Sequence, residues 1–121
     1  MTDFSGELVK GLQGLGLQIS AESHERLVLY FTELKKWSAK INLIGKSAGD
    51  EQILESHFLD SLTLMPQLGG GHCHLLDIGT GAGFPGLVCK AVLPGISVTL
   101  VEPRLKRVSF LKHMVRRLGL D

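Results

Sequence analysis

Glycines and an acid stand at the places where two neighbouring strands would end. Three alternate glycines, Gly79, Gly81 and Gly83, follow the apolar stretch 74–78. Glycines at this spacing permit a tight turn with positive φ and let the backbone approach a ligand closely. Glu102 stands 23 residues after Gly79, at the end of the next apolar stretch. Because a carboxylate there accepts hydrogen bonds from the hydroxyls of a ribose, these residues predict a site for a nucleoside-containing cofactor.

The same turn leaves more than one ligand open. Residues 81–86 match the dinucleotide spacing G-x-G-x-x-G, which alone is weak evidence for NAD. Two features argue against a dinucleotide: Asp77 would face a pyrophosphate unfavourably but suits a cationic α-amino group, and Phe84 and Pro85 are bulky where phosphates would approach. The alternative without a ligand is a turn that serves only strand-to-helix geometry, which four glycines in register with Asp77 and Glu102 disfavour.

A strand–helix–strand–helix order must position this turn. Residues 74–78 predict a buried strand, 85–93 a helix, 96–102 an alternating second strand, and 105–118 a helix that stops at Gly119. This order is a right-handed βαβ unit with parallel strands and one further helix. The inward stripe of the last helix is predicted to be Leu105, Val108, Leu111, Val115 and Leu118.

Residues before this unit are predicted to be helical. A short helix is expected near 7–12, a second is capped by Ser20, and a third runs from about 50 to Met65 before Pro66. The glycines 69–71 are interpreted as a linker. The second helix carries one apolar stripe, formed by Leu27, Phe31, Leu34, Trp37 and Ile41.

Basic residues are clustered although the net charge of the chain is only +1. Six bases stand between residue 104 and the single acid Asp121, and a second run comprises Lys35, Lys36, Lys40 and Lys46. Such clusters are either solvated helix faces or the sign of an anionic partner such as nucleic acid. For an RNA partner, the residues predicted to track phosphates are Arg104, Arg107, Lys112 and Arg116. Rings for RNA bases are present in Tyr30 and Trp37, although Trp37 lies on the apolar stripe and is expected in the core.

Four blocks of sequence together resemble the RsmG family, also called glucose-inhibited division protein B. They are KINLI at 40–44, HFLDSL at 57–62, LDIGTGAGFPG at 76–86 and VEPRLKR at 101–107. The resemblance implies a Rossmann-like class I methyltransferase fold, S-adenosyl-L-methionine as cofactor, and methylation of N7 of a guanine in 16S ribosomal RNA. One departure is Ile44, where the family more often has threonine, so a hydroxyl contact at that position is in doubt.

The resemblance also extends the cofactor site. It implies that Phe84 lines the methionine and ribose end, that Glu102 holds the ribose, and that Pro103 and Arg104 flank the adenine. The predicted cofactor-binding residues are therefore Asp77, Gly79, Gly81, Gly83, Phe84, Glu102, Pro103 and Arg104.

The catalytic residues stay unknown, with three candidates in the helical region. Guanine N7 carries a free lone pair, so orientation and charge matter more than a general base. The candidates are Asn42, His57 and Asp60, of which His57 and Asp60 share one helix face. Asn42 and Asp60 either border the cofactor pocket, or Asp60 only pairs with His57 or caps the glycine turn. Residues 72–74 read His-Cys-His, but successive strand residues point to opposite faces, so no metal site is predicted.

We expect an α/β fold in two parts. Residues 1–72 are the helical N-terminal region, and 73–121 are the first β-α-β-α half of a truncated S-adenosylmethionine-binding domain. Two parallel strands leave an open hydrophobic edge, so the chain is expected to be a fragment or to complete its sheet with another copy or segment. The two cysteines, Cys73 and Cys89, are expected to be reduced thiols of a cytoplasmic protein, and no apolar run is long enough to span a membrane.

Three functions remain open from the sequence. The first is a ribosomal RNA methyltransferase whose partner is 16S ribosomal RNA or a small-subunit assembly intermediate. The second is an NAD-binding oxidoreductase fragment, and the third is a non-catalytic RNA-binding fragment. Self-association through the unfinished sheet edge is one of the ways in which the chain could complete its sheet, and no membrane partner is expected.

Overall fold

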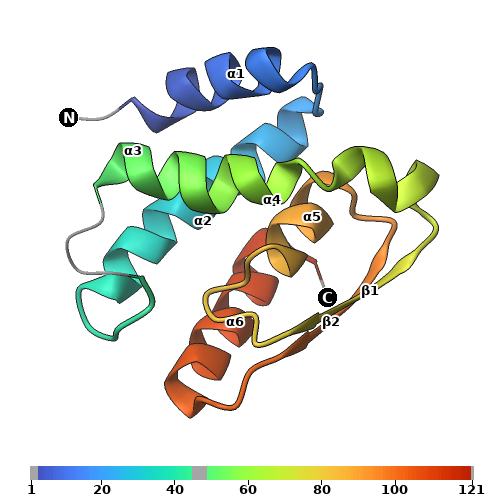
Figure 1. Cartoon of the computed structure of the whole chain (residues 1–121). Helices are drawn as coiled ribbons and strands as arrows, with labels where there is room; N and C mark the ends of the chain where they lie inside the picture. The colour runs from blue at the N-terminus through green and yellow to red at the C-terminus, as the bar shows by residue number, and fades with distance from the viewer. Residues whose placement is uncertain (1–2, 45–48, 121) are drawn as a thin grey trace.

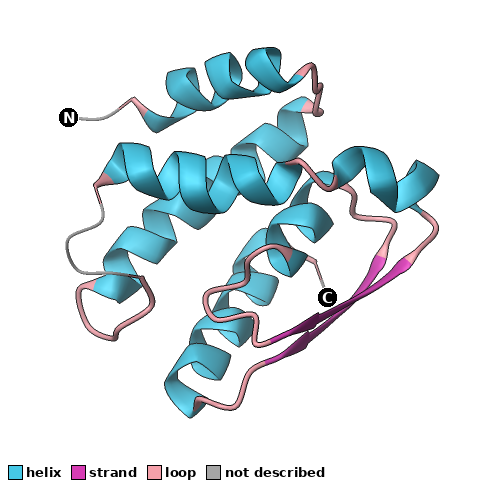
Figure 2. Ribbon diagram, in the orientation of Figure 1, coloured by secondary structure: helices cyan, strands magenta, loops and turns pink. Residues whose placement is uncertain are grey.

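The computed structural model describes residues 3–44 and 49–120, so Lys46 and Asp121 lie outside the described residues. Helices form most of this part of the chain, and two strands lie along one side of it (Figures 1 and 2). In chain order the elements are α1 (Phe4–Leu15), α2 (Ala21–Ser38), α3 (Asp50–Ile53), the π-helix η1 (Leu54–Leu59), α4 (Asp60–Leu62), the 3₁₀-helix η2 (Met65–Gly71), β1 (His74–Ile78), α5 (Gly86–Val92), β2 (Ser97–Val101) and α6 (Leu105–Leu118).

The first two helices begin at side-chain caps. Ser20 accepts a hydrogen bond from the N–H of Ser23 at 3.0 Å, which confirms it as the N-cap of α2. Asp3 caps α1 in the same way through the N–H of Gly6, also at 3.0 Å. This cap and the buried side chains of Phe4 and Leu8 make α1 longer than predicted, despite its glycines.

The third predicted helix is built differently from the expectation. Residues 50–62 pass from α3 through one π-helical stretch to α4, and Leu54, Phe58 and Leu62 are buried as predicted. The glycines 69–71, interpreted as a linker, instead belong to η2, with Pro66 in its first turn. The linker interpretation was wrong. The fixed φ of proline suits the first turn of a 3₁₀-helix, so a helical segment begins at Met65 and continues through the glycines before β1.

The two strands form a parallel sheet connected through α5, which confirms the βαβ unit. Their register runs from His74 opposite Ser97 to Ile78 opposite Val101. The prediction that 74–78 is a buried strand was wrong for one face, because Leu76 is 55% and Ile78 72% exposed. The helices lie on the other side of the sheet, where α5 contacts both strands (Figure 2).

One hydrophobic core joins the N-terminal helices to the βαβ unit. The rings of Phe4 and Phe31 stack with centroids 4.0 Å apart, and Phe58 packs edge-on against Tyr30 at 5.3 Å. The same cluster of buried residues continues into α5 and α6, so the two predicted parts share their core, and the boundary at residue 72 stays a prediction. Leu105, predicted to face inward, is 82% exposed because it occupies the first turn of α6 at the rim of a surface hollow.

Among the described residues, none of the helices has the length and apolar character needed to cross a membrane.

Candidate functional site

The glycine turn has the backbone conformation that its sequence predicts. Gly79, Gly81 and Gly83 all have positive φ, at 73°, 62° and 101°. The N–H groups of Gly79 and Thr80 bond the carbonyl of Val101 at 2.8 and 3.2 Å, so the turn continues directly from the sheet. A Cβ at Gly79 would meet nothing within 4 Å, and one at Gly81 would meet only the Arg107 guanidinium at 3.9 Å. The first two glycines therefore leave open space over the backbone at the carboxyl end of the sheet.

Gly83 and Gly86 have a different role, because both are buried against other parts of the protein. A Cβ at Gly83 would collide with the Tyr30 hydroxyl and lie 3.0 Å from Cβ of Leu87. A Cβ at Gly86 would lie 2.6 Å from Leu100. These two glycines allow close packing between the turn and the core, so the prediction that Gly83 binds the cofactor has no open surface to support it.

Asp77 holds the glycine turn from inside. Its Oδ2 atom accepts hydrogen bonds from the Thr80 hydroxyl at 2.6 Å and from the N–H of Gly86 at 2.9 Å. One carboxylate oxygen thus ties the start of the turn to the start of α5. The predicted contact of Asp77 with a cofactor amino group stays a prediction. The carboxylate has lone pairs that these two hydrogen bonds do not use and that an amino group could bond.

Glu102 lies beside the open part of the turn, as the sequence predicts. Its two oxygens accept hydrogen bonds from the N–H of Arg104 at 3.0 Å and from the N–H of Gly81 at 2.9 Å. The hydrogen bond from Arg104 is the largest cause of the lowered pKa of Glu102. Burial opposes it, and the Gly81 bond and the charges of Arg107 and Arg104 lower the pKa further. The carboxylate is therefore ionised and fixed in direction at neutral pH.

Tyr30 supports the turn from α2, which sequence reasoning missed. Its hydroxyl donates a hydrogen bond to the carbonyl of Ala82, and its ring stacks on Phe84 with centroids 5.6 Å apart. The side chain is fully buried, which raises its pKa well above the ordinary value and excludes the predicted stacking on RNA. The available signal was a hydroxyl next to an apolar helical stripe, because a buried tyrosine hydroxyl needs a polar partner.

His57 and Asp60 lie on the Phe84 side of the turn. The imidazole of His57 stacks on Phe84 with ring centroids 4.9 Å apart. Burial lowers the pKa of His57 and outweighs the opposing charge of Asp60, so the ring is neutral at pH 7. Asp60 is exposed and lines a hollow together with Ser61 and Phe84.

Asn42 lies elsewhere, in a second hollow near the start of α6. This hollow is also lined by Arg104 and Arg107, and the Nε atom of Arg107 donates to the Asn42 carbonyl at 3.4 Å. Asn42 and Asp60 therefore line different hollows. Of the predicted RNA-binding residues, Arg104 and Arg107 line this hollow, whereas Lys112 and Arg116 are exposed on α6 and do not line it.

Of the run His72, Cys73 and His74, only His74 belongs to β1, and the other two residues lie just before the strand. His74 Nε2 and Thr99 Oγ1 are within hydrogen-bond distance at 2.9 Å on the exposed face of the sheet. Cys73 and Cys89 are both free thiols, and burial raises the pKa of Cys89 to about 11. Over residues 3–44 and 49–120, no group of three or more His, Cys, Asp or Glu side chains is gathered closely enough to hold a metal ion.

Comparison with known proteins shows the family to which the chain belongs. The sequence model of the GidB family, described as rRNA small subunit methyltransferase G, matches residues 23–121. The chain belongs to this family. GidB relatives include a ribosomal RNA small subunit methyltransferase G of Desulfotalea psychrophila, 57% identical over 98% of this chain and 54% of that protein. One from Myxococcus xanthus is 45% identical over the same shares, and one from Acetivibrio thermocellus is 37% identical over 93% of this chain and 46% of that protein.

The chain spans about half the length of the GidB relatives it matches. The match covers the glycine turn, Glu102 and most of the helical region that supports them. The family membership therefore confirms the resemblance found in the sequence and the assignment to an α/β methyltransferase fold.

Proposed function

We propose that the protein to which this sequence belongs methylates N7 of a guanine in 16S ribosomal RNA, with S-adenosyl-L-methionine as methyl donor. The observation that carries the proposal is the open glycine turn beside the fixed, ionised carboxylate of Glu102. Membership of the GidB family supports the reaction class.

The residues present fit this cofactor. The space over Gly79 and Gly81 would admit the methionine part close to the backbone. Glu102 keeps lone pairs for the two ribose hydroxyls while its bonds from Gly81 and Arg104 hold it in place. Pro103 and Arg104 follow it directly and would flank the adenine.

The chemistry needs orientation more than proton transfer. When bound, S-adenosyl-L-methionine would supply an electrophilic methyl group on its sulfonium for attack by the lone pair of guanine N7, with the sulfonium becoming a neutral thioether. No proton leaves N7, so the chain must position the base and stabilise the positive charge that the base gains. Asp60 is suited to the second task because its carboxylate lines the hollow beside Phe84. His57, neutral and stacked on Phe84, is suited to shaping that hollow.

The proposed partner is 16S ribosomal RNA, free or in a small-subunit assembly intermediate, and the proposed location is the cytoplasm. Both follow from the reaction of the GidB family, whose members are named for the ribosomal small subunit.

Calorimetry with this chain tests the proposal. S-adenosyl-L-methionine is expected to bind, NAD is not, and Glu102→Ala is expected to lose most of the affinity. Glu25→Ala, which removes an exposed carboxylate on α2, is the matched control and should bind normally. Binding of NAD in place of S-adenosyl-L-methionine would establish the oxidoreductase alternative. Cofactor binding without single-turnover methylation of small-subunit RNA would favour a non-catalytic fragment.

A further inference from the structure

A continuous groove lies between the C-terminal end of α2 and α6, apart from the space over the glycine turn. It consists of two adjoining hollows of about 460 and 440 Å³, which share Lys40 and Ile41. We call it the α2–α6 groove. The first hollow is lined by Glu33, Lys36, Trp37, Lys40, Ile41 and His113. The second adds Asn42, Arg104, Leu105, Lys106 and Arg107.

Trp37 forms the aromatic wall of the first hollow. Its ring packs edge-on against Phe110 at 5.5 Å and lies 5.0 Å from the ring of His113. The sequence placed Trp37 in the core, but the side chain is only half-buried and lines the hollow. An aromatic ring held in this way at a surface is a platform on which a nucleic-acid base stacks.

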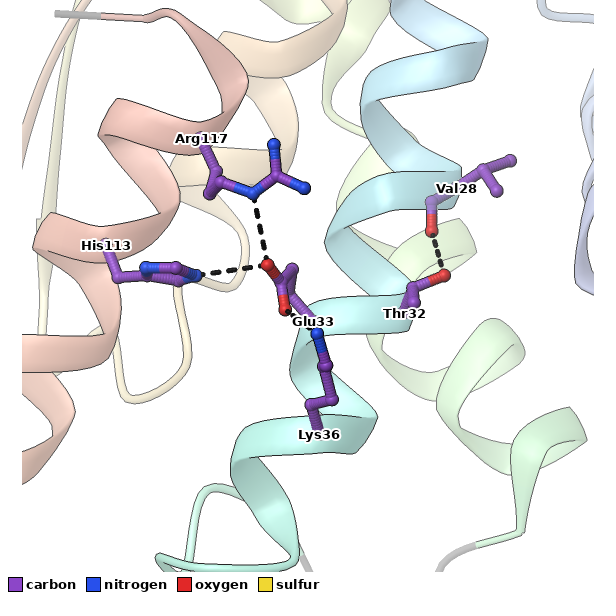
Figure 3. A network of polar contacts seen from close by, with 6 residues as sticks. All are labelled: Val28, Thr32, Glu33, Lys36, His113 and Arg117. Carbon is purple, nitrogen blue, oxygen red and sulfur yellow. Dashed lines mark hydrogen bonds and ion pairs between the residues drawn. The ribbon is translucent and has the colours of Figure 1, made fainter.

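The charge of the groove is basic because its one acidic lining residue, Glu33, is paired with basic side chains. Glu33 is 5% exposed at its side chain and receives hydrogen bonds from His113 Nε2 and Arg117 Nε, both at 3.2 Å (Figure 3). Lys36 Nζ lies 3.7 Å from its other oxygen. Burial raises the pKa of Glu33, but the two hydrogen bonds and the lysine charge together lower it below its usual range. The carboxylate is therefore ionised but matched by cations.

The bases along the rim are exposed to solvent, including Lys36, which also pairs with Glu33. Lys36 is 74% exposed at its side chain, and Lys40, Arg104 and Lys106 are exposed as well. A row of cations over an apolar, aromatic floor is complementary to a single nucleic-acid strand, whose phosphates are charged and whose bases are flat and apolar.

We propose that the α2–α6 groove binds a single-stranded segment of RNA, with one base stacked on Trp37 and the phosphates beside Lys36, Lys40 and Lys106. The source of the strand rests on the proposed function. The groove ends at Arg107, whose guanidinium lies 3.9 Å from the place of a Gly81 Cβ. The strand would therefore run from Trp37 toward the glycine turn, where the cofactor is proposed to bind.

The single tryptophan of the chain makes this proposal directly measurable, because fluorescence excited at wavelengths that Tyr30 does not absorb reports on Trp37 alone. A single-stranded oligoribonucleotide of about ten nucleotides is titrated into the chain. Quenching of the fluorescence is expected, with an affinity that falls as salt is raised. Lys40→Ala should weaken binding and lower the salt slope by about 0.7, whereas Lys10→Ala, which removes an exposed lysine on α1, should change neither.

Variants of Trp37, followed by fluorescence anisotropy of a labelled oligoribonucleotide, separate stacking from folding. Trp37→Ala should weaken binding about tenfold, and Trp37→Phe, which keeps a ring against Phe110, should weaken it less. Thermal unfolding of both variants shows whether the fold is kept, and the Lys40→Ala result stands if Trp37→Ala is unfolded.

The outcomes distinguish this proposal from the proposed function. If RNA binds without changing Trp37 fluorescence, and Lys40→Ala binds RNA as tightly as the original chain, the proposed binding of RNA in the α2–α6 groove is wrong. The methyltransferase proposal then still stands. Absence of RNA binding in a chain that binds S-adenosyl-L-methionine also overturns the groove. Quenching by RNA in a chain that fails to bind the cofactor supports the groove and counts against the cofactor site.

Discussion

Tyr30→Phe removes one oxygen atom and tests whether α2 holds the glycine turn. The lost group is the hydroxyl that donates to the Ala82 carbonyl, in a residue with no exposed surface. The phenyl ring stays, so the stacking on Phe84 and the edge contact with Phe58 are kept. The substitution therefore isolates the hydrogen bond.

The expected cost follows from burial of both partners. A buried carbonyl that loses its donor costs about 1–3 kcal/mol, because no water replaces the hydroxyl. For a chain of 121 residues this lowers the melting temperature by about 4 °C per kcal/mol. Since Ala82 lies between Gly81 and Gly83 in the turn, affinity for S-adenosyl-L-methionine should fall as well.

Urea unfolding and calorimetry measure the two effects separately. The matched control is Thr32→Val, which removes a hydroxyl from an exposed residue of the same helix, where it donates to the Val28 carbonyl at 3.0 Å (Figure 3). This control should stay within about 0.5 kcal/mol of the original chain. If Tyr30→Phe is as stable as Thr32→Val and binds cofactor equally well, α2 does not hold the turn and the reasoning is wrong.

Three further outcomes are expected. Gly83→Ala should destabilise the chain by about 2 kcal/mol or more in thermal unfolding, because the new Cβ would collide with the Tyr30 hydroxyl and the backbone φ is 101°. Gly14→Ala, whose Cβ would meet nothing within 4 Å, should not destabilise it. Because the pKa values of Glu33 and Glu102 are lowered in the folded state, the stability they contribute is present above the unfolded value of about 4.3 and is lost as pH falls through the folded values. Urea unfolding from neutral to acid pH, with Glu33→Gln flattening the curve, checks this; an unchanged curve contradicts it. The chain should self-associate through its exposed sheet face, so its sedimentation coefficient should increase with protein concentration. Ile78→Lys should reduce this dependence on concentration. A chain that stays monomeric at all concentrations argues against association through that face.

Elements whose ends are marked by local chemistry were predictable from the sequence. Ser20 caps α2, and Gly119 ends α6 in the left-handed conformation, because each acts within a few residues of its own position. Leu105 was misplaced because periodicity alone does not tell where a helix leaves the core. The exposure of Ile78 was missed for a related reason, since an apolar run does not reveal how many faces of its strand are covered.

The sequence predicted the residues around the open space of the candidate site, but not the contacts that hold the glycine turn in place. Gly79, Gly81 and Glu102 follow from spacing, because strand ends in a parallel sheet meet at one edge. The role of Asp77 depends on the return of α5 to the strand end, where Gly86 donates to it. The bond from Tyr30 joins residues 52 positions apart, and no local pattern encodes such a pair.

Helix α2 connects the separate pieces of the site. Tyr30 bonds the glycine turn, Arg26 donates to the Ala91 carbonyl at 3.0 Å, and Glu33 pairs with α6. The Ala91 carbonyl belongs to the last turn of α5, where helical carbonyls lack partners within their own helix. One helix thus supplies a polar contact to the turn, to α5 and to α6, in addition to its share of the common core. The position of the glycine turn therefore depends on the helical region as well as on the two strands.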